Sequence, residues 1–198
     1  MRLILASASP RRARILESLG LLFDVRPADV DESLLPGESP KAAVRRLARL
    51  KALVPSCGPR ACVIAADTLV VLGPRVLGKP ADRAEARAML RDLSGRTHTV
   101  MTGVAVAWGG RVATAVDLTD VRFRKMDKQE IARYVATGEP SDKAGAYHVE
   151  GGGAAFIESI HGSPSNVAGL SITTARRLLT LAGFSLPSHR KAIGQRRG

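Results

Sequence analysis

The first third of the chain alternates short apolar runs with apolar residues at helical spacing. The runs predict strands over residues 2–6 and 23–25. Apolar residues three and four apart predict a helix over residues 10–19, with Ser9 as its N-cap, and a second helix that opens at Ser39 and Pro40. An acidic, turn-rich loop with the sequence PADVDESLLPGESP joins the second strand to the second helix.

The pattern then changes to longer strands. Residues 61–66 form a continuous apolar run that predicts a buried strand ended by Asp67, and a hairpin around Gly73 and Pro74 follows. Asp82 and Glu85 resemble a capping box at the start of a helix. Two long β-rich runs flank Gly109 and Gly110. The remaining predicted elements are a helix after Asp127, a glycine-rich loop over 138–153, a strand over 154–160 and a helix over 168–182.

No internal repeat and no long linker divides the 198 residues. We therefore expect one domain over residues 1–186 and a loose basic tail over residues 187–198. The mixed order of strands and helices predicts an α/β or α+β fold. No apolar run reaches about 18 residues, so no transmembrane helix is expected, and the short apolar start is not a signal peptide. A cytoplasmic protein is the resulting expectation.

The net charge of +12 raises the question of nucleic-acid binding. Four of the basic residues lie in the tail (Arg190, Lys191, Arg196 and Arg197), and aromatic residues make up only 4% of the chain. Because no aromatic residue is interleaved with the basic runs, a solvated basic surface is favoured over a nucleic-acid interface. Cys57 and Cys62 lack a metal or redox spacing and are predicted to be free thiols.

The opening segment contains an electrostatic conflict. Arg11 and Arg12 stand in the first turn of the predicted helix, where positive charge opposes the helix macrodipole. An anion bound there would remove the conflict. The hydroxyls of Ser7 and Ser9, the free N–H groups of the helix start and the two guanidinium groups together suit a polyphosphate. No Walker loop is present.

Other polar residues are weaker indications of a binding site when each is taken alone. Asp67 follows a buried strand, and Asp31 and Glu32 could join it around a hard cation. Lys79 and the pair Asp142–Lys143 could face phosphate or water, and the glycines at 151–153 could allow a ligand to approach the backbone. The four histidines show no ligand spacing.

Taken together, these segments resemble the Maf-like nucleoside triphosphate pyrophosphatases. The resemblance runs in order through LASASPRR, RLARLKA, AADTLV, LGKP, SGRTHTVMTGVAV, TDVRFR, YVATGEPSDKAGAY and IHGSPSNVAGL, and it stops near Gly183. It implies an α/β fold with an elongated central mixed sheet flanked by helices, as in inosine triphosphatases, and two lobes around a nucleotide cleft. It also implies hydrolysis of a nucleoside triphosphate to the monophosphate and pyrophosphate with a divalent metal, Mg²⁺ or Mn²⁺.

The resemblance also assigns roles to residues. Asp67 corresponds to the proposed proton acceptor, and Ser7, Arg11 and Arg12 to the phosphate-binding loop. Further polar cleft positions fall on Glu32, Lys51 and Lys79. Glu32 and Asp67 are the expected metal ligands. Whether Asp67 orients the water, takes its proton or binds the metal stays open.

The residues that would determine base specificity resemble two different subfamilies. Arg11, Thr68 and the DKAGAY segment resemble the branch that acts on dTTP and UTP, whereas Glu150 stands where that branch usually has glutamine. Glutamate at this position resembles the branch that acts on 7-methyl-GTP. Arg11 disfavours that branch, because a cationic 7-methylguanine ring prefers the tryptophan found there. We therefore expect hydrolysis of dTTP and UTP, with 7-methyl-GTP as the alternative substrate.

Two other function classes stay open at this point. One is a catalytically inactive nucleotide-binding regulator of cell division, and the other is the nucleic-acid-binding protein considered above. The retained Asp67, Lys51 and Lys79 favour the enzyme. The expected partner is the nucleoside triphosphate, without a specific nucleic acid or a membrane. A homodimer is a family expectation that the residues themselves do not address.

Overall fold

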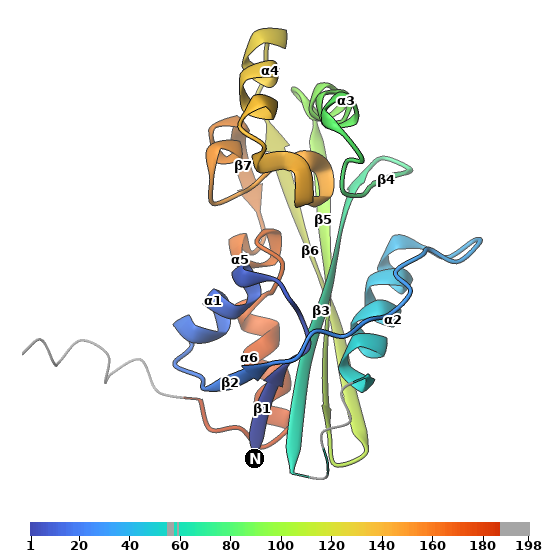
Figure 1. Cartoon of the computed structure of the whole chain (residues 1–198), viewed down its shortest axis with the longest axis vertical. Coiled ribbons are helices and arrows are strands. Elements are labelled where there is room, and N and C mark those ends of the chain that lie inside the picture. Colours follow the sequence, from blue (N-terminus) through green and yellow to red (C-terminus); the bar gives the residue numbers. More distant parts are fainter. Residues whose placement is uncertain (55–57, 59, 187–198) are drawn as a thin grey trace, which may run out of the picture.

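Seven strands form one mixed sheet that runs the length of the molecule (Figure 1). The order is β2-β1-β3-β5-β6-β7, with β4 on the free edge of β3. β1 is parallel to β2 and β3, and the other neighbours are antiparallel. The strands are β1 (Arg2–Leu5), β2 (Phe23–Val25), β3 (Ala61–Leu72), β4 (Arg75–Leu77), β5 (Thr97–Trp108), β6 (Arg111–Phe123) and β7 (Ile157–His161).

The helices begin where the sequence places good N-caps. Side chains of Ser9, Ser39, Asp82 and Asp127 each accept a hydrogen bond from the backbone three residues on. The helices are α1 (Pro10–Ser18), α2 (Pro40–Leu53), α3 (Arg83–Leu93), α4 (Lys128–Ala136), α5 (Pro164–Val167) and α6 (Ile172–Leu181). Three 3₁₀ turns also occur: η1 (Glu139–Asp142), η2 (Ala144–Ala146) and η3 (Gly152–Phe156).

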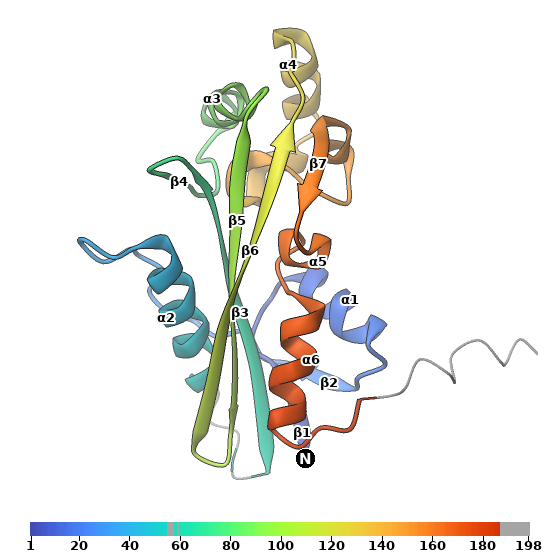
Figure 2. The ribbon, with the colours of Figure 1, turned by 180° about the vertical axis from the view of Figure 1, so that it is seen from behind.

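The two ends of the sheet form two lobes, and the lobe at the bottom of Figure 1 has helices on both faces of the sheet. α1 and α6 cover one face and α2 covers the other, as the front and back views show (Figures 1 and 2). α2 lies so close to β5 that a Cβ at Gly103 would stand 2.1 Å from the carbonyl oxygen of Val44. Glycine is therefore required at this contact for steric reasons rather than for its torsion angles.

The upper lobe is built on the far ends of β3, β5 and β6. α3, α4 and the 3₁₀ turns enclose its core around Phe123, Tyr147 and Phe156, whose rings pack in tilted and edge-to-face pairs. His98 lies among these rings, and its Nε2 is 2.9 Å from the Tyr147 hydroxyl. β5 and β6 continue through both lobes, so the lobes share one sheet.

The structure confirms the expected α/β fold and corrects the position of Asp67. β3 does not end at residue 66: Asp67 lies in the middle of a strand of 12 residues. On one edge β3 pairs with β1 as far as Ile64 and with β4 from Val70 onward. In the part of the chain that the structure describes, residues 66–69 have a strand neighbour only on the β5 side. This gap leaves room for a polar side chain in mid-strand.

Two other boundaries were predicted wrongly. The strand expected over 154–160 begins only at Ile157, because residues 152–156 form η3. The helix expected over 168–182 begins only at Ile172, as α6, and the short α5 before it ends at Val167. In both cases an apolar run predicts one regular element, because periodicity alone does not reveal a 3₁₀ turn or an irregular stretch at its start.

The structure, a computed structural model, describes residues 1–54, 58 and 60–186. Cys57 and the predicted basic tail lie outside these residues. Cys62 is a free, buried thiol, as predicted, and its burial raises its pKa to about 12. Among the described residues, no helix is long and apolar enough to cross a membrane.

Candidate active site

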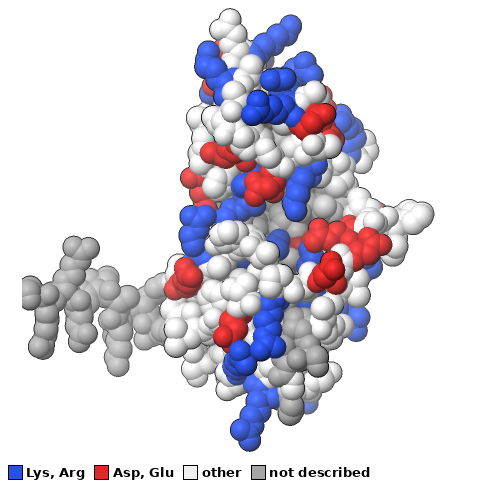
Figure 3. All heavy atoms as spheres, in the orientation of Figure 1, with Lys and Arg blue, Asp and Glu red and all other residues white. Residues whose placement is uncertain are grey.

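A cleft of about 520 Å³ opens where β3 has its unpaired stretch, between the two lobes. Both signs of charge surround the hollow in the space-filling view (Figure 3). Its lining combines the β1–α1 loop and the start of α1, Glu32, Lys51, the middle of β3, Lys79, residues 142–144 and 147–149, and residues 167–169. The cleft therefore brings together most of the residues that the sequence singled out.

Lys51 connects two carboxylates at one end of the cleft. Its Nζ lies 2.6 Å from Oδ1 of Asp67 and 2.6 Å from Oε1 of Glu32. Lys51 and Asp67 are both buried, whereas the Glu32 side chain is 56% exposed. Burial acts to raise the pKa of Glu32, but the hydrogen bond and the charge of Lys51 outweigh it and lower the pKa. All three groups are therefore held in one charged cluster.

Arg12 turns into the protein at the same end. Its Nε donates to the carbonyl of Gly169 at 2.9 Å, one terminal nitrogen donates to Ser7 Oγ at 3.0 Å, and the other donates to Thr68 Oγ1 at 3.3 Å. Burial lowers the pKa of Arg12, and the negative charge of Asp67 partly opposes this effect. The Arg12 guanidinium therefore fixes the β1–α1 loop against β3 and places positive charge behind Asp67.

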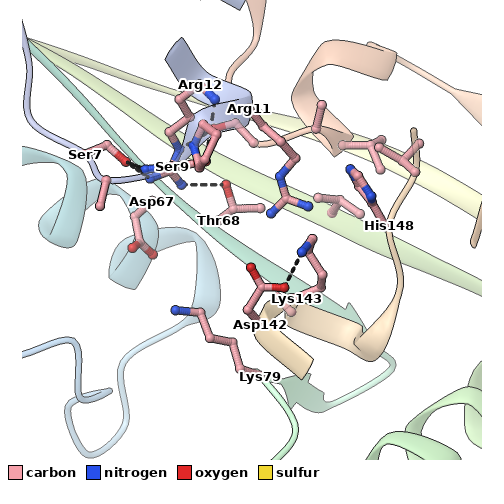
Figure 4. Close-up of a pocket in the computed structure, with 18 of the residues that line it drawn as sticks. Ser7, Ser9, Arg11, Arg12, Asp67, Thr68, Lys79, Asp142, Lys143 and His148 are labelled. Carbon is pink, nitrogen blue, oxygen red and sulfur yellow. Dashed lines mark hydrogen bonds and ion pairs between the residues drawn. The ribbon is translucent and has the colours of Figure 1, made fainter. Parts of the chain in front are cut away.

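Arg11 does not form a fork with Arg12. The close-up shows its guanidinium extending in the other direction, toward Lys143 and His148 (Figure 4). Burial lowers the pKa of Arg11, whereas Asp142 and Glu150 act to raise it. Both arginines line the cleft, but their side chains diverge, because consecutive residues on a helix point about 100° apart. That they hold one polyphosphate stays a prediction.

Three further predicted residues lie near the charged cluster. Ser7 is buried, and its Oγ accepts from the Ser9 amide at 3.2 Å. Ser9 caps α1, as predicted, so the side chain predicted for ligand binding is also used by the helix. Lys79 follows β4 and extends into the cleft from the opposite wall (Figure 4).

The other end of the cleft has apolar and aromatic walls. Val70, Ala144, Tyr147 and Val149 contribute to it, together with His148. Thr68, between the two ends, shares a hydrogen bond of 2.9 Å with Thr102. An apolar recess beside a charged one is what a nucleotide requires, because its base is flat and largely apolar and its phosphates are anionic.

Sequence reasoning missed His148 as a cleft residue. Its Nε2 is buried, has no hydrogen-bond partner and lies 3.9 Å from Oε2 of Glu150. Burial, Arg11 and Lys143 lower the pKa of His148, against the opposing charges of Glu139 and Glu150. Glu150 itself is 50% exposed and is not among the described residues that line the cleft. The only sequence signal was the position of His148 within the AYHVEGGG segment.

Comparison with known proteins decides the family. The family model described as "Maf-like protein" matches residues 2–182. The chain belongs to the Maf family. This span covers both lobes and every cleft residue described above.

Curated relatives of this Maf chain are similar over nearly their whole length. A protein from Anaeromyxobacter dehalogenans is 53% identical over 94% of this chain and 96% of its own, and it is named dTTP/UTP pyrophosphatase. Proteins with the same name from Chromobacterium violaceum and Aquifex aeolicus are each 47% identical, over 94% and 90% of this chain and 97% and 94% of their own. Among solved structures, a HAM1 protein from Coxiella burnetii aligns over 91% of this chain and 99% of its own, with a TM-score of 0.47 and 18% identity.

The donor set of this Maf cleft fits a small divalent cation bound together with a substrate. Mg²⁺ is usually held by one or two carboxylates plus phosphate oxygens and water. The oxygens of Asp67 and Glu32 both contact one ammonium nitrogen, so they lie within twice 2.6 Å of each other. No group of three His, Cys, Asp or Glu residues suited to a metal occurs among the described residues. The two carboxylates would therefore need the triphosphate to complete a coordination shell.

Proposed function

We propose that this Maf protein hydrolyses dTTP and UTP to the monophosphate and pyrophosphate. The observation that carries the proposal is the cleft itself, in which the buried Asp67–Lys51 pair faces one end and an apolar wall faces the other. The printed names of relatives that are 47–53% identical support the same substrates. The proposal rests on this agreement between the site chemistry and the family.

The charged end suits the triphosphate. Lys79 and Lys51 come from opposite walls, and the first turn of α1 adds the backbone N–H of Arg11, because Pro10 has none and the N–H of Arg12 donates to Ser9. Arg12 contributes long-range positive potential while its own hydrogen bonds are satisfied within the protein. These groups would neutralise part of the negative charge that develops as pyrophosphate leaves.

Asp67 is placed to handle the attacking water. In the proposed step, the water oxygen forms a bond to the α-phosphorus, the bond from the α-phosphorus to the bridging oxygen breaks, and pyrophosphate leaves with that oxygen. Asp67 accepts the proton that the water loses. Lys51 holds the carboxylate at 2.6 Å and so fixes its orientation toward the cleft.

Glu32 and Asp67 would hold a divalent metal. When bound, Mg²⁺ or Mn²⁺ neutralises phosphate charge and lowers the pKa of water. Asp67 would serve either as a metal ligand or as the proton acceptor, and both roles require its carboxylate.

The apolar end suits a pyrimidine better than 7-methylguanine. Arg11 and Lys143 both carry positive charge near His148 at this end of the cleft, and a cationic ring beside them would be repelled. Glu150, the residue that favours 7-methyl-GTP in the sequence, has its side chain half exposed outside the lining. The placement of these residues therefore supports dTTP and UTP.

The test is pyrophosphate release with Mg²⁺ or Mn²⁺ from dTTP, UTP, 7-methyl-GTP, GTP and ATP. We expect turnover of dTTP and UTP that is lost on addition of EDTA and falls at least about a thousandfold in Asp67→Asn. Asp92→Asn is the matched control, because Asp92 pairs with Arg75 at the surface of the upper lobe. Preference for 7-methyl-GTP would overturn the substrate assignment. Binding without turnover of any nucleotide would instead favour the inactive regulator. Dimerisation stays an expectation from the family, and cytoplasmic location stays a prediction from the sequence.

A further inference from the structure

One half-buried carboxylate holds the glycine-rich loop beside the cleft. Glu139, in η1, accepts the Tyr134 hydroxyl at 2.7 Å and the Gly153 amide at 3.2 Å on Oε1, and the Gly152 amide at 3.1 Å on Oε2. The hydrogen bond from Tyr134 acts against burial and helps to lower the pKa of Glu139. Three donors on one carboxylate make a strong local anchor, because bonds to an ionised acceptor are stronger than neutral ones.

The glycines allow this anchor to form. A Cβ at Gly151 would lie 2.6 Å from Oε2 of Glu139, and one at Gly153 would lie 2.9 Å from the Tyr134 hydroxyl. Side chains at these positions would therefore push the loop away from Glu139. The close backbone approach that the sequence suggested is an approach to the protein's own carboxylate.

The anchored loop leads directly into the base end of the cleft. The Tyr134 hydroxyl, which donates to Glu139, also accepts from the backbone amide of His148 at 3.0 Å. Tyr147, His148 and Val149 are the cleft-lining residues of this segment. A shift of the loop would move this wall of the cleft, whereas Asp67 and Lys51 on β3 and α2 would stay in place.

We propose that Glu139, through Tyr134, is a positioning residue for base recognition: it holds the segment Tyr147–Val149 at the distance at which a pyrimidine fills the apolar end. This inference rests on the proposed function, because it assigns the apolar end to the base. Glu139 itself does not contact the substrate. It acts by removing the freedom of a segment that contains several glycines and would otherwise have to be ordered on binding.

Glu139→Gln tests the proposal. The side chain keeps its size, but its NH₂ group must then face one of three donors, so at least one hydrogen bond is lost. We expect the KM for UTP to rise about tenfold, and the preference for UTP over ATP to fall by a similar factor. The inhibition constant of inorganic tripolyphosphate, which uses only the charged end, should stay within about twofold of the wild-type value.

Hydrogen exchange provides a second readout. In Glu139→Gln the amides of Gly152 and Gly153 should lose protection, since their acceptor is weakened. The matched control is Glu158→Gln, which removes a surface carboxylate paired with Arg122 in the same lobe. It should change neither UTP kinetics nor exchange in this loop. Tyr134→Phe removes the shared hydroxyl and should act in the same direction, which covers the case in which Glu139→Gln does not fold.

The outcomes separate the two proposals. If the wild-type protein releases no pyrophosphate from UTP or dTTP, the proposed function fails first. If the wild type prefers UTP, and Glu139→Gln exposes the loop amides but keeps the preference, the positioning role is refuted alone. An equal loss of tripolyphosphate binding would also refute it, because the damage would then extend to the charged end.

Discussion

Removal of the Lys51 ammonium should be costly because its main partner is buried. The side chains of Lys51 and Asp67 are only 7% and 8% exposed, and their atoms are 2.6 Å apart. Breaking a buried ion pair by removing one partner typically costs about 3–5 kcal/mol, because an uncompensated charge stays behind. Glu32, at 56% exposure, can turn to solvent and adds little. We therefore expect Lys51→Met to lower the free energy of unfolding by about 3 kcal/mol.

The assay is urea unfolding of four proteins: the wild type, Lys51→Met, Asp67→Asn and the double variant. If the cost comes from the isolated carboxylate, the double variant should recover most of the loss, because a neutral amide needs no counter-charge. Arg75→Met is the control, since the Arg75 and Asp92 side chains are 62% and 37% exposed. It should cost less than about 1 kcal/mol.

Two results would refute this reasoning. A loss below about 1 kcal/mol in Lys51→Met would mean that water or Glu32 rearranges to solvate Asp67 as well as the ammonium does. A double variant no more stable than Lys51→Met would mean that the cost does not come from the isolated Asp67 carboxylate.

The remaining predictions concern the two lobes. Burial lowers the pKa of His98 to about 4 in the folded protein. In the unfolded chain the same histidine takes up its proton near pH 6.5. The free energy of unfolding should therefore fall by about 2 kcal/mol as the pH is lowered from 7 to 5. His98→Gln, which can still bond Tyr147 but does not titrate, should remove this part of the pH dependence in urea titrations, and an unchanged slope would contradict the assignment. Gly103→Ala places a Cβ 2.1 Å from the Val44 carbonyl, so α2 must shift and the thermal midpoint should fall by an amount equivalent to at least about 2 kcal/mol. Gly78→Ala, where a Cβ would meet nothing within 4 Å, is its control and should leave the midpoint nearly unchanged.

The local features of this protein could be predicted from the sequence. Ser9, Ser39, Asp82 and Asp127 were all expected at helix starts, and all four cap their helices. A cap and an apolar stripe depend on residues within one or two turns, so the chain itself contains the information. The hairpins at Gly73 and Gly109 follow for the same reason: these turns require positive φ, which glycine adopts at low cost.

The sequence predicted which types of residue the candidate site contains, but not how they are arranged. Which residues meet depends on contacts between distant segments, such as the bond from Arg12 to the carbonyl of Gly169, 157 residues away. Asp67 reaches the cleft because β1 and β4 leave part of one β3 edge unpaired, and no pattern within residues 61–72 records where other strands stop.

The tertiary structure also decided what neighbouring residues do. Arg11 and Arg12 are adjacent in sequence, yet the turn of α1 sends one along the cleft and the other into the protein. Glu139 and the glycines 12 to 14 residues later form an anchor only because η1 and the end of α4 pack beside η3. The sequence by itself therefore determined the local elements and the chemical types available. The assembled sheet decided which of them share a site, because shared space is a property of long-range packing and not of spacing along the chain.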